Sequence, residues 1–311
     1  MKLRYLAGVA ACALAIAGAR ADAQRTHVLI VTGLSGDATF KKSFTQVATT
    51  VRDVARTKWG VSDSSLIVLT EDSLPGPLSR GRSTKEAVAN AFMSLSQRVQ
   101  PGDVLLVLLV GHGSGEGPQS KVNLPGVDAT AADYATWLSG FSKQSIVFVN
   151  AATGSGDFVN VLKAPGRVVV TATRSAVEKN ESMFAGLFAQ AVSSDASDAD
   201  KDGRVSVLEA FRYTTREVAK VYESSGRMQT EHAQISDSVK AMTVSFGKSV
   251  TSNDPRVVAL VAERQALESQ VADLRGKKTS MDSTAYDREL ERLLIAIAEK
   301  SAAIRAAGGK P

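Results

Sequence analysis

Cysteine is nearly absent from this chain of 311 residues, because Cys12 is the only one. Cys12 lies within an apolar N-terminal leader, so a chain from which the leader has been removed contains no thiol. Disulfides, zinc-thiolate sites and a cysteine nucleophile are therefore excluded for the processed protein. This absence restricts the function more than any other feature of the composition.

Three other shortages narrow the class of protein. Aromatic residues make up only 5% of the chain, so we expect an aliphatic core. Beyond the leader no apolar run approaches the roughly 20 residues that a membrane-spanning helix needs. The formal net charge is +5, and it falls to +3 without residues 1–23, which hold three basic and one acidic residue. So small an excess excludes the strongly basic surface of a typical nucleic-acid-binding protein.

The N-terminus has the pattern of a secretory signal peptide. Lys2 and Arg4 precede the apolar run 6–18, and Ala21 and Ala23 supply the small residues that signal peptidase requires. We expect cleavage after Ala23 and export to the periplasm or the medium.

From residue 27 onward, apolar strand-like runs alternate with amphipathic helical stretches. This alternation predicts an α/β domain over 24–250, with a mainly parallel sheet and helices on both of its faces. The expected strands are 27–32, 65–70, 103–110, 145–150 and 167–172. The expected helices lie near 40–58, 84–99, 130–140 and 182–193, and either Ser83 or Thr84 could cap the second of them.

The last part of the chain, 251–311, has a different pattern. Of the 58 residues from 254 onward, 10 are basic and 9 are acidic, and apolar residues recur every seven positions. Two helices, about 255–275 and 283–306, would form an antiparallel coiled hairpin. The hairpin could brace the α/β domain, mediate a homodimer or bind a partner through 254–306.

Candidate site residues follow two of the expected strands, at the sheet edge where open α/β sheets build their sites. His112 and Gly113 follow the third strand, where a histidine could act as general base beside a backbone N–H that stabilises an oxyanion. The segment NAATGSG, 150–156, follows the fourth strand.

Three blocks of sequence together resemble the caspase-like clan of cysteine peptidases, and its legumain branch in particular. They are VLLVLLVGHGSG (104–115), IVFVNAATGSG (146–156) and VVVTATRSAVEKNESMFAGLF (168–188), within a resemblance that covers roughly residues 27–222. The resemblance implies a caspase-like fold with a peptide-binding cleft. It also places Thr153 where the family has its cysteine, which removes thiolate chemistry.

This substitution leaves three alternatives open. The protein could be a pseudopeptidase that binds a peptide or protein without cleaving it. It could be an endopeptidase in which His112 activates the hydroxyl of Thr153 or Ser155, with Gly113 contributing to the oxyanion site. It could also be a scaffold that acts through the helical hairpin. No acidic partner for His112 can be assigned, because Glu116, Asp128 and Asp157 are candidates only by their proximity in the chain.

The other two histidines, His27 and His232, are expected to be structural.

A calcium-binding loop is predicted at 198–209, which matches the EF-hand pattern at each diagnostic position. Oxygen ligands are expected from the side chains of Asp198, Asp200, Asp202, Ser206 and Glu209. Arg204 is expected to contribute its backbone carbonyl oxygen. Gly203 supplies the turn and Val205 the apolar residue. The alternative is an Asp-rich turn that caps the following helix without an ion. We expect a weak structural Ca²⁺ site, because no second loop of this form accompanies it.

Overall fold

The computed structural model describes residues 24–72, 79–199, 203–246 and 254–308, and its centre is a seven-stranded sheet. The strand order is β11-β9-β8-β4-β1-β2-β3. The five central strands are parallel: β1 (Thr26–Thr32), β2 (Leu66–Thr70), β4 (Val104–Val110), β8 (Ser145–Asn150) and β9 (Arg167–Thr171). The predicted α/β class with a mainly parallel sheet is confirmed.

Two short strands at the sheet edges were not predicted. β3 (Ser79–Arg82) runs parallel to β2, and β11 (Gln234–Ile235) pairs antiparallel with β9. Both are too short and too polar to produce an apolar run in the sequence. β11 matters for the site, because it brings the segment before α7 alongside β9.

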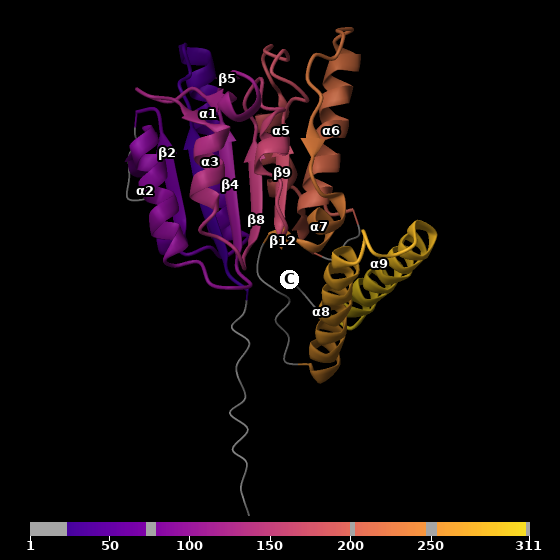
Figure 1. Ribbon diagram of the computed structural model, residues 1–311. Helices are drawn as coiled ribbons and strands as arrows, with labels where there is room; N and C mark the ends of the chain where they lie inside the picture. Colours follow the sequence, from indigo (N-terminus) through magenta and orange to yellow (C-terminus); the bar gives the residue numbers. More distant parts are fainter. Residues whose placement is uncertain (1–23, 73–78, 200–202, 247–253, 309–311) are drawn as a thin grey trace, which may run out of the picture.

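Helices cover both faces of the sheet, which makes three layers (Figure 1). One face carries α1 (Ala38–Thr57), α5 (Phe184–Ser193), α6 (Val207–Ser224) and α7 (Ser238–Thr243). The other face carries α2 (Lys85–Ser96), α3 (Ala131–Leu138) and α4 (Phe158–Leu162). Successive strand residues point to opposite faces, so each continuous apolar run contributes side chains to two separate cores, one on either face of the sheet.

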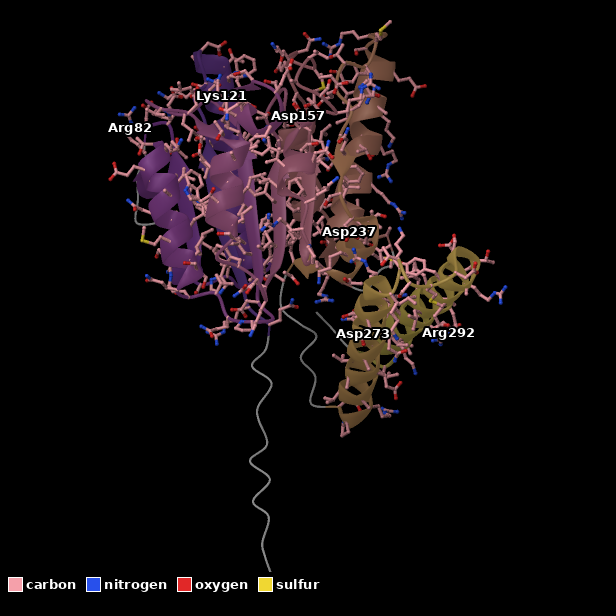
Figure 2. The ribbon with its side chains drawn as sticks, in the orientation of Figure 1. Arg82, Lys121, Asp157, Asp237, Asp273 and Arg292 are labelled. Atoms are coloured by element: carbon pink, nitrogen blue, oxygen red, sulfur yellow. The ribbon has the colours of Figure 1, made fainter. Side chains whose placement is uncertain are left out.

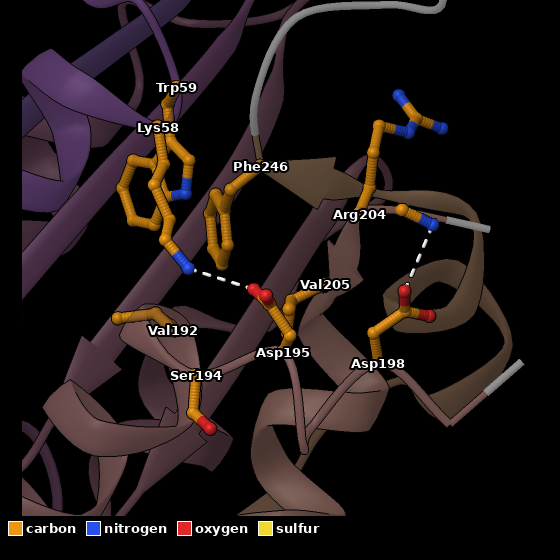
Figure 3. A pocket seen from close by; sticks show the side chains of 10 residues that line it. Lys58, Trp59, Val192, Ser194, Asp195, Asp198, Arg204, Val205 and Phe246 are labelled. Carbon is orange, nitrogen blue, oxygen red and sulfur yellow. Dashed lines mark hydrogen bonds and ion pairs between the residues drawn. The ribbon is translucent and has the colours of Figure 1, made fainter. Parts of the chain in front are cut away.

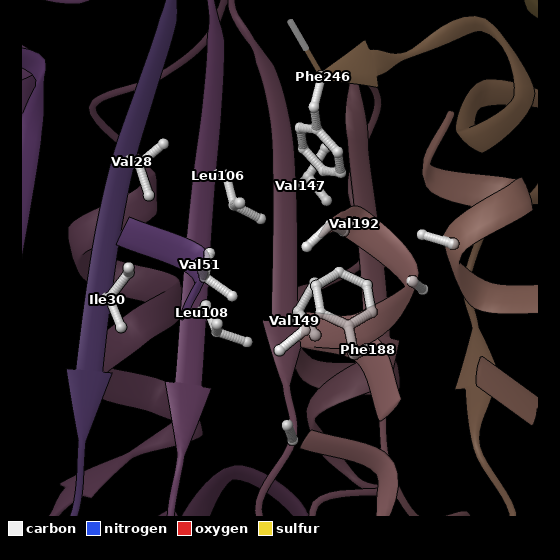
Figure 4. Packing of buried hydrophobic residues seen from close by; sticks show 14 of the residues in the cluster. Val28, Ile30, Val51, Leu106, Leu108, Val147, Val149, Phe188, Val192 and Phe246 are labelled. Carbon is white, nitrogen blue, oxygen red and sulfur yellow. The ribbon is translucent and has the colours of Figure 1, made fainter. Parts of the chain in front are cut away.

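Aliphatic strand residues meet helix side chains in these cores, as Figure 4 shows for Ile30, Leu108 and Val149 against Val51 and Phe188. The expectation of an aliphatic core is confirmed, because most of the buried apolar residues are Val, Leu, Ile or Ala. The largest fully buried side chains are mostly aromatic and include Tyr134, Phe92, Phe148, Phe158, Phe184, Phe188 and Phe246. The few aromatic residues are concentrated inside because each buries a large apolar area.

Side-chain caps define where several helices begin. Asp37 accepts hydrogen bonds from the N–H groups of the first turn of α1. Thr84, rather than Ser83, caps α2, while the Ser83 hydroxyl donates to the Thr32 carbonyl at 2.6 Å. Thr130 forms a capping box with Asp133 at the start of α3. These contacts satisfy N–H groups that a helix cannot bond internally.

Small sheets and single turns complete the domain. β5 (Gly113–Ser114), β6 (Lys121–Val122) and β7 (Ala129–Thr130) form an antiparallel sheet beyond β4. β10 (Val205–Ser206) pairs antiparallel with β12 (Ser245–Phe246). Two 3-10 turns, η1 (Asp63–Ser65) and η2 (Gly117–Gln119), lie in loops.

The last two helices are α8 (Pro255–Gly276) and α9 (Ser283–Ala306), which lie beyond the amino-terminal ends of the strands (Figure 1). They share an apolar cluster that includes Val271, Leu274 and Leu293, and Val239 of α7 packs against this cluster. Arg275 of α8 also forms an ion pair with Asp237, the cap of α7. Both contacts join the two helices to the α/β layers.

Within the described part of the chain, no helix is long and apolar enough to cross a membrane. Residues 1–23, where a signal peptide is expected, lie outside that part.

Candidate functional site

The carboxyl ends of three parallel strands bring the residues of the candidate site to one edge of the sheet. His112 and Gly113 follow β4, Thr153 and Ser155 follow β8, and Ser35 follows β1. In Figure 2 this is the edge where Lys121 and Asp157 are labelled. The predicted position of the site at this edge follows directly from the parallel arrangement.

The His112 side chain is held by an aromatic pair and a carbonyl group. Its ring meets Phe40 edge-on at 4.6 Å and Phe44 at 5.4 Å, both on α1. Its Nε2 lies 3.3 Å from the Ser35 carbonyl oxygen. A carbonyl oxygen only accepts, so Nε2 carries a proton and donates it, and Nδ1 is the nitrogen that remains to act as a base in the neutral ring.

The loop that orients His112 leads to a carboxylate. The hydroxyl of buried Ser35 donates to Glu71 Oε2 at 2.5 Å, and its N–H donates to the same oxygen at 3.2 Å. Glu71 follows β2, so it reaches the histidine indirectly, through the backbone of Ser35. Sequence proximity could not suggest this acid, which lies 41 positions before His112.

The Thr153 hydroxyl accepts a hydrogen bond from the Gly113 N–H, which is the backbone donor expected to stabilise an oxyanion. The donor–acceptor distance is 3.3 Å, and Thr153 is 4% exposed. A Cβ at Gly113 would lie 2.6 Å from the Thr153 carbonyl oxygen and 2.7 Å from that of Lys121. Only glycine therefore permits these two loops to approach so closely.

Ser155, the alternative hydroxyl, is buried deeper than Thr153. It is 1% exposed, and its Oγ lies 3.2 Å from Thr173 Oγ1 beyond the end of β9. The N–H of Ser155 also donates to Thr173 Oγ1 at 2.7 Å. These bonds join the β8 and β9 ends and direct the serine hydroxyl into the interior.

None of the three acids considered as partners for His112 forms a hydrogen bond or ion pair with it in the described structure, and two of them bind elsewhere. Asp157 accepts the N–H of Gly117 at 2.7 Å. Asp128 accepts the N–H of Leu124 at 3.0 Å and pairs with Lys121 at 2.7 Å. Glu116 is exposed. The bonds of Asp157 and Asp128 shape the loops around the site and do not orient the histidine.

A second histidine at this edge does have a carboxylate partner. His232 Nδ1 lies 2.6 Å from Glu178 Oε1, and the His232 N–H donates to Oε2 at 3.1 Å. The Glu178 backbone carbonyl accepts the N–H of Gly154, which connects the pair to the turn that follows β8. No local pattern could reveal this pair, because its members lie 54 positions apart.

His27 lies at the opposite edge of the sheet, at the start of β1. It is 4% exposed, and its Nε2 is 3.2 Å from Asp103 Oδ2. Burial lowers the pKa of His27, and Asp103 offsets this only in part. His27 therefore lies far from His112 in the fold.

The predicted calcium loop is described only in part, because Asp200 and Asp202 lie outside the described residues. Asp198 Oδ2 accepts the N–H of Gly203 at 2.9 Å (Figure 3), and Glu209 Oε1 accepts that of Ala199 at 2.8 Å. Ser206 and Glu209 also form a capping box at the start of α6. These hydrogen bonds hold the carboxylates of Asp198 and Glu209, two of the expected ligands, against backbone N–H groups of the same segment.

The pairing of β10 with β12 anchors this loop to the domain. A pocket of about 470 Å³ lies beside the loop, where Trp59 stacks on Phe246 with ring centroids 4.7 Å apart. Lys58 donates to the Ser193 carbonyl at 2.7 Å and pairs with Asp195 at 2.8 Å. Among the residues that the structure describes, no three acidic or histidine side chains gather as metal ligands.

Comparison with known proteins finds no matching family model and no matching curated protein. Among solved structures, the fold is similar to the crystal structure of protein GSU0716 from Geobacter sulfurreducens. The TM-score is 0.44 at 10% sequence identity, over 75% of this chain and 96% of that one.

Proposed function

We propose that the chain is an exported protein of the caspase-like and legumain-like kind that binds an extended peptide or protein segment without cleaving it. The observation that carries the proposal is the contact between the Gly113 N–H and Thr153 Oγ1, 3.3 Å long. It occupies the backbone donor that acyl transfer would need for an oxyanion. The sequence resemblance stands beside it as independent support.

The hydrogen bonds of the site also favour binding over hydrolysis. Activation of a hydroxyl requires a base within hydrogen-bond reach. Among the described residues no hydrogen bond joins His112 to Thr153 or Ser155: the Nε2 of His112 bonds the Ser35 carbonyl, and Ser155 Oγ lies against Thr173. A threonine hydroxyl is also much less acidic than a thiol, so it gains less from a weakly coupled histidine.

Exposed apolar side chains in loops around this edge fit a binding role. Leu34 follows β1, Val127 lies between β6 and β7, and Val177 follows β9. They are 38%, 71% and 79% exposed. Exposed apolar side chains near a recessed polar site are the kind of surface that contacts an extended peptide.

The test uses protein comprising residues 24–311, a mixed peptide library and calcium, with mass spectrometry of both cleaved and co-eluting peptides. We expect no cleavage above that of Thr153→Ala and His112→Ala, and retention of a subset of peptides. Val177→Asp should reduce retention, whereas Val258→Asp on α8, where the valine is 53% exposed, should not.

Each other outcome identifies an alternative. Cleavage that both active-site variants abolish would establish the hydroxyl-dependent endopeptidase and overturn the proposal. Retention lost in Val258→Asp but kept in Val177→Asp would instead favour a scaffold that acts through α8 and α9. Thr153→Cys adds a direct test of the resemblance, because cleavage by this variant alone would indicate a peptidase cleft that lacks only its thiol.

We further propose that 198–209 binds Ca²⁺ as a structural ion. Asp198, Asp200, Asp202, the Arg204 carbonyl, Ser206 and Glu209 supply the oxygen ligands that a hard cation prefers. Calcium bound only to the native state would raise the melting temperature. An unchanged melting curve in chelator and in Asp198→Ala would contradict this role, with magnesium as the control cation.

A further inference from the structure

A pocket of about 630 Å³ lies where the amino-terminal edge of the sheet meets α7 and the end of α8, and the proposed function does not use it. Its walls are the segment 163–167, which ends at the first residue of β9, the first turn of α7, and Arg275 with Gly276. Figure 2 labels Asp237 at this junction, between the α/β layers and the last two helices.

The charges that line the pocket are predominantly positive. Four cations, Lys163, Arg167, Lys240 and Arg275, surround it with a single acid, Asp237. Asp237 is already paired with Arg275. Glu268 lies on the far side of Lys240, but it pairs with Arg264 at 3.5 Å. Even with Glu268 counted, two positive charges remain unbalanced.

Lys240 is the cation that most needs a counterion. Burial lowers its pKa, and the nearby charge of Glu268 offsets this only in part. Its ammonium group makes no hydrogen bond or ion pair with the residues that the structure describes, although its backbone N–H donates to Asp237. Lys240 is partly buried, so its ammonium group has lost part of its hydration, and an anion bound in the pocket would lower the cost of that loss.

The other cations differ in how freely they can move. Arg167 donates to the carbonyl groups of Leu162 and Leu138 at 2.7 and 3.2 Å, so its guanidinium is fixed. Lys163 is exposed and makes one contact of 3.3 Å with Asn160. The pocket thus combines a fixed cation, a partly buried one and an exposed one.

We propose that this pocket binds the phosphate group of a small dianionic ligand, either inorganic phosphate or a phosphate monoester. A ligand with two negative charges would neutralise the two unbalanced positive charges, whereas a single carboxylate would neutralise only one. Lys240 would donate to the phosphate from inside, and Lys163 would close over it from the mouth. Exposed Ala164 and Pro165 would contact the apolar part of a monoester.

Isothermal titration calorimetry on residues 24–311 at low ionic strength tests the proposal, with calcium removed by chelator so that phosphate stays in solution. Inorganic phosphate and glycerol phosphate are the two probes, and the tighter one identifies the source of the phosphate. Lys240→Met should weaken the better probe about tenfold or more, the loss of one charge-assisted hydrogen bond. Lys163→Met should weaken it less.

Lys179→Met is the matched control, because Lys179 is an exposed lysine at the opposite edge of the sheet, and it should bind as the wild type does. Melting curves of all variants separate lost binding from lost folding, and Lys240→Met should melt no lower than the wild type. Absence of binding for both probes in the millimolar range would overturn the proposal. Equal weakening by Lys240→Met and Lys179→Met would also overturn it.

Discussion

Gly156 and Gly186 offer a matched pair of alanine substitutions with opposite expected effects on stability. Gly156 lies in the turn after β8 that carries Thr153 and Ser155. A Cβ there would lie 2.1 Å from the Arg174 carbonyl carbon and 2.3 Å from the Ser175 nitrogen. Both neighbours are backbone atoms, so neither can move aside without shifting the loop after β9.

The magnitudes follow from these surroundings. Overpacking against backbone should destabilise Gly156→Ala by about 3 kcal/mol. Gly186 is an exposed position of α5 with nothing within 4 Å of the added carbon, so Gly186→Ala should gain about 1 kcal/mol of helix stability. At about 2 °C per kcal/mol for a chain of this size, the melting temperatures should change by about −6 °C and +2 °C.

Differential scanning calorimetry of the two variants and the wild type measures both shifts in one buffer. A Gly156→Ala melting temperature within about 1 °C of the wild type would refute the close approach of the two loops. A fall in melting temperature for Gly186→Ala would refute the exposed helical position of that residue. Because the first substitution moves the turn that holds Thr153, it should also reduce peptide retention, while the second should leave retention unchanged.

Three further substitutions test buried polar groups. The Tyr134 hydroxyl is fully buried without a hydrogen-bond partner in the described part of the chain. Tyr134→Phe should therefore leave the free energy of unfolding in urea unchanged or raise it by about 1 kcal/mol, and a decrease would show that the hydroxyl has a partner. Ser206→Ala should cost about 1 kcal/mol by removing the cap of α6, and an unaltered urea midpoint in chelator would contradict that role. His27 has a lowered pKa when folded, so its neutral form stabilises the protein above the unfolded pKa of 6.5, and this contribution is lost as pH falls from 6.5 through the folded pKa. Urea midpoints from pH 7.5 downward should therefore fall more steeply for the wild type than for His27→Gln, and parallel curves would contradict this effect.

Long apolar runs made the sheet predictable. The expected strand 103–110 corresponds to β4 at Val104–Val110, and 145–150 corresponds to β8, because continuous apolar runs suit strands buried on both faces. β3 and β11 were missed because their pairing depends on neighbours far away in the chain. Thr84 and Ser83 were equivalent candidates for a cap, and only the fold shows that the Ser83 hydroxyl bonds Thr32 instead.

The site was predictable in position but not in its contacts. Parallel topology alone places His112 and Thr153 at one edge, since both follow neighbouring strands. The partner of the His112 ring is the carbonyl group of Ser35, 77 positions earlier. The carboxylate that binds His232 is that of Glu178, 54 positions earlier. Such pairings depend on how loops fold back over the sheet, and no periodicity or local spacing encodes them.

The proposed peptide site and the proposed phosphate pocket lie at opposite ends of the same strand, and this makes their tests independent. β9 runs from Arg167, which lines the phosphate pocket, to Thr171, two residues before the Thr173 that bonds Ser155. At about 3.3 Å per strand residue, the ends of β9 are roughly 13 Å apart, beyond the range over which substitutions usually couple. A change at Lys240 should therefore leave peptide retention intact, and a change at Thr153 should leave phosphate binding intact. If either substitution altered both, the parallel sheet would be transmitting a conformational change between its edges, and the two sites would have to be understood as one coupled system.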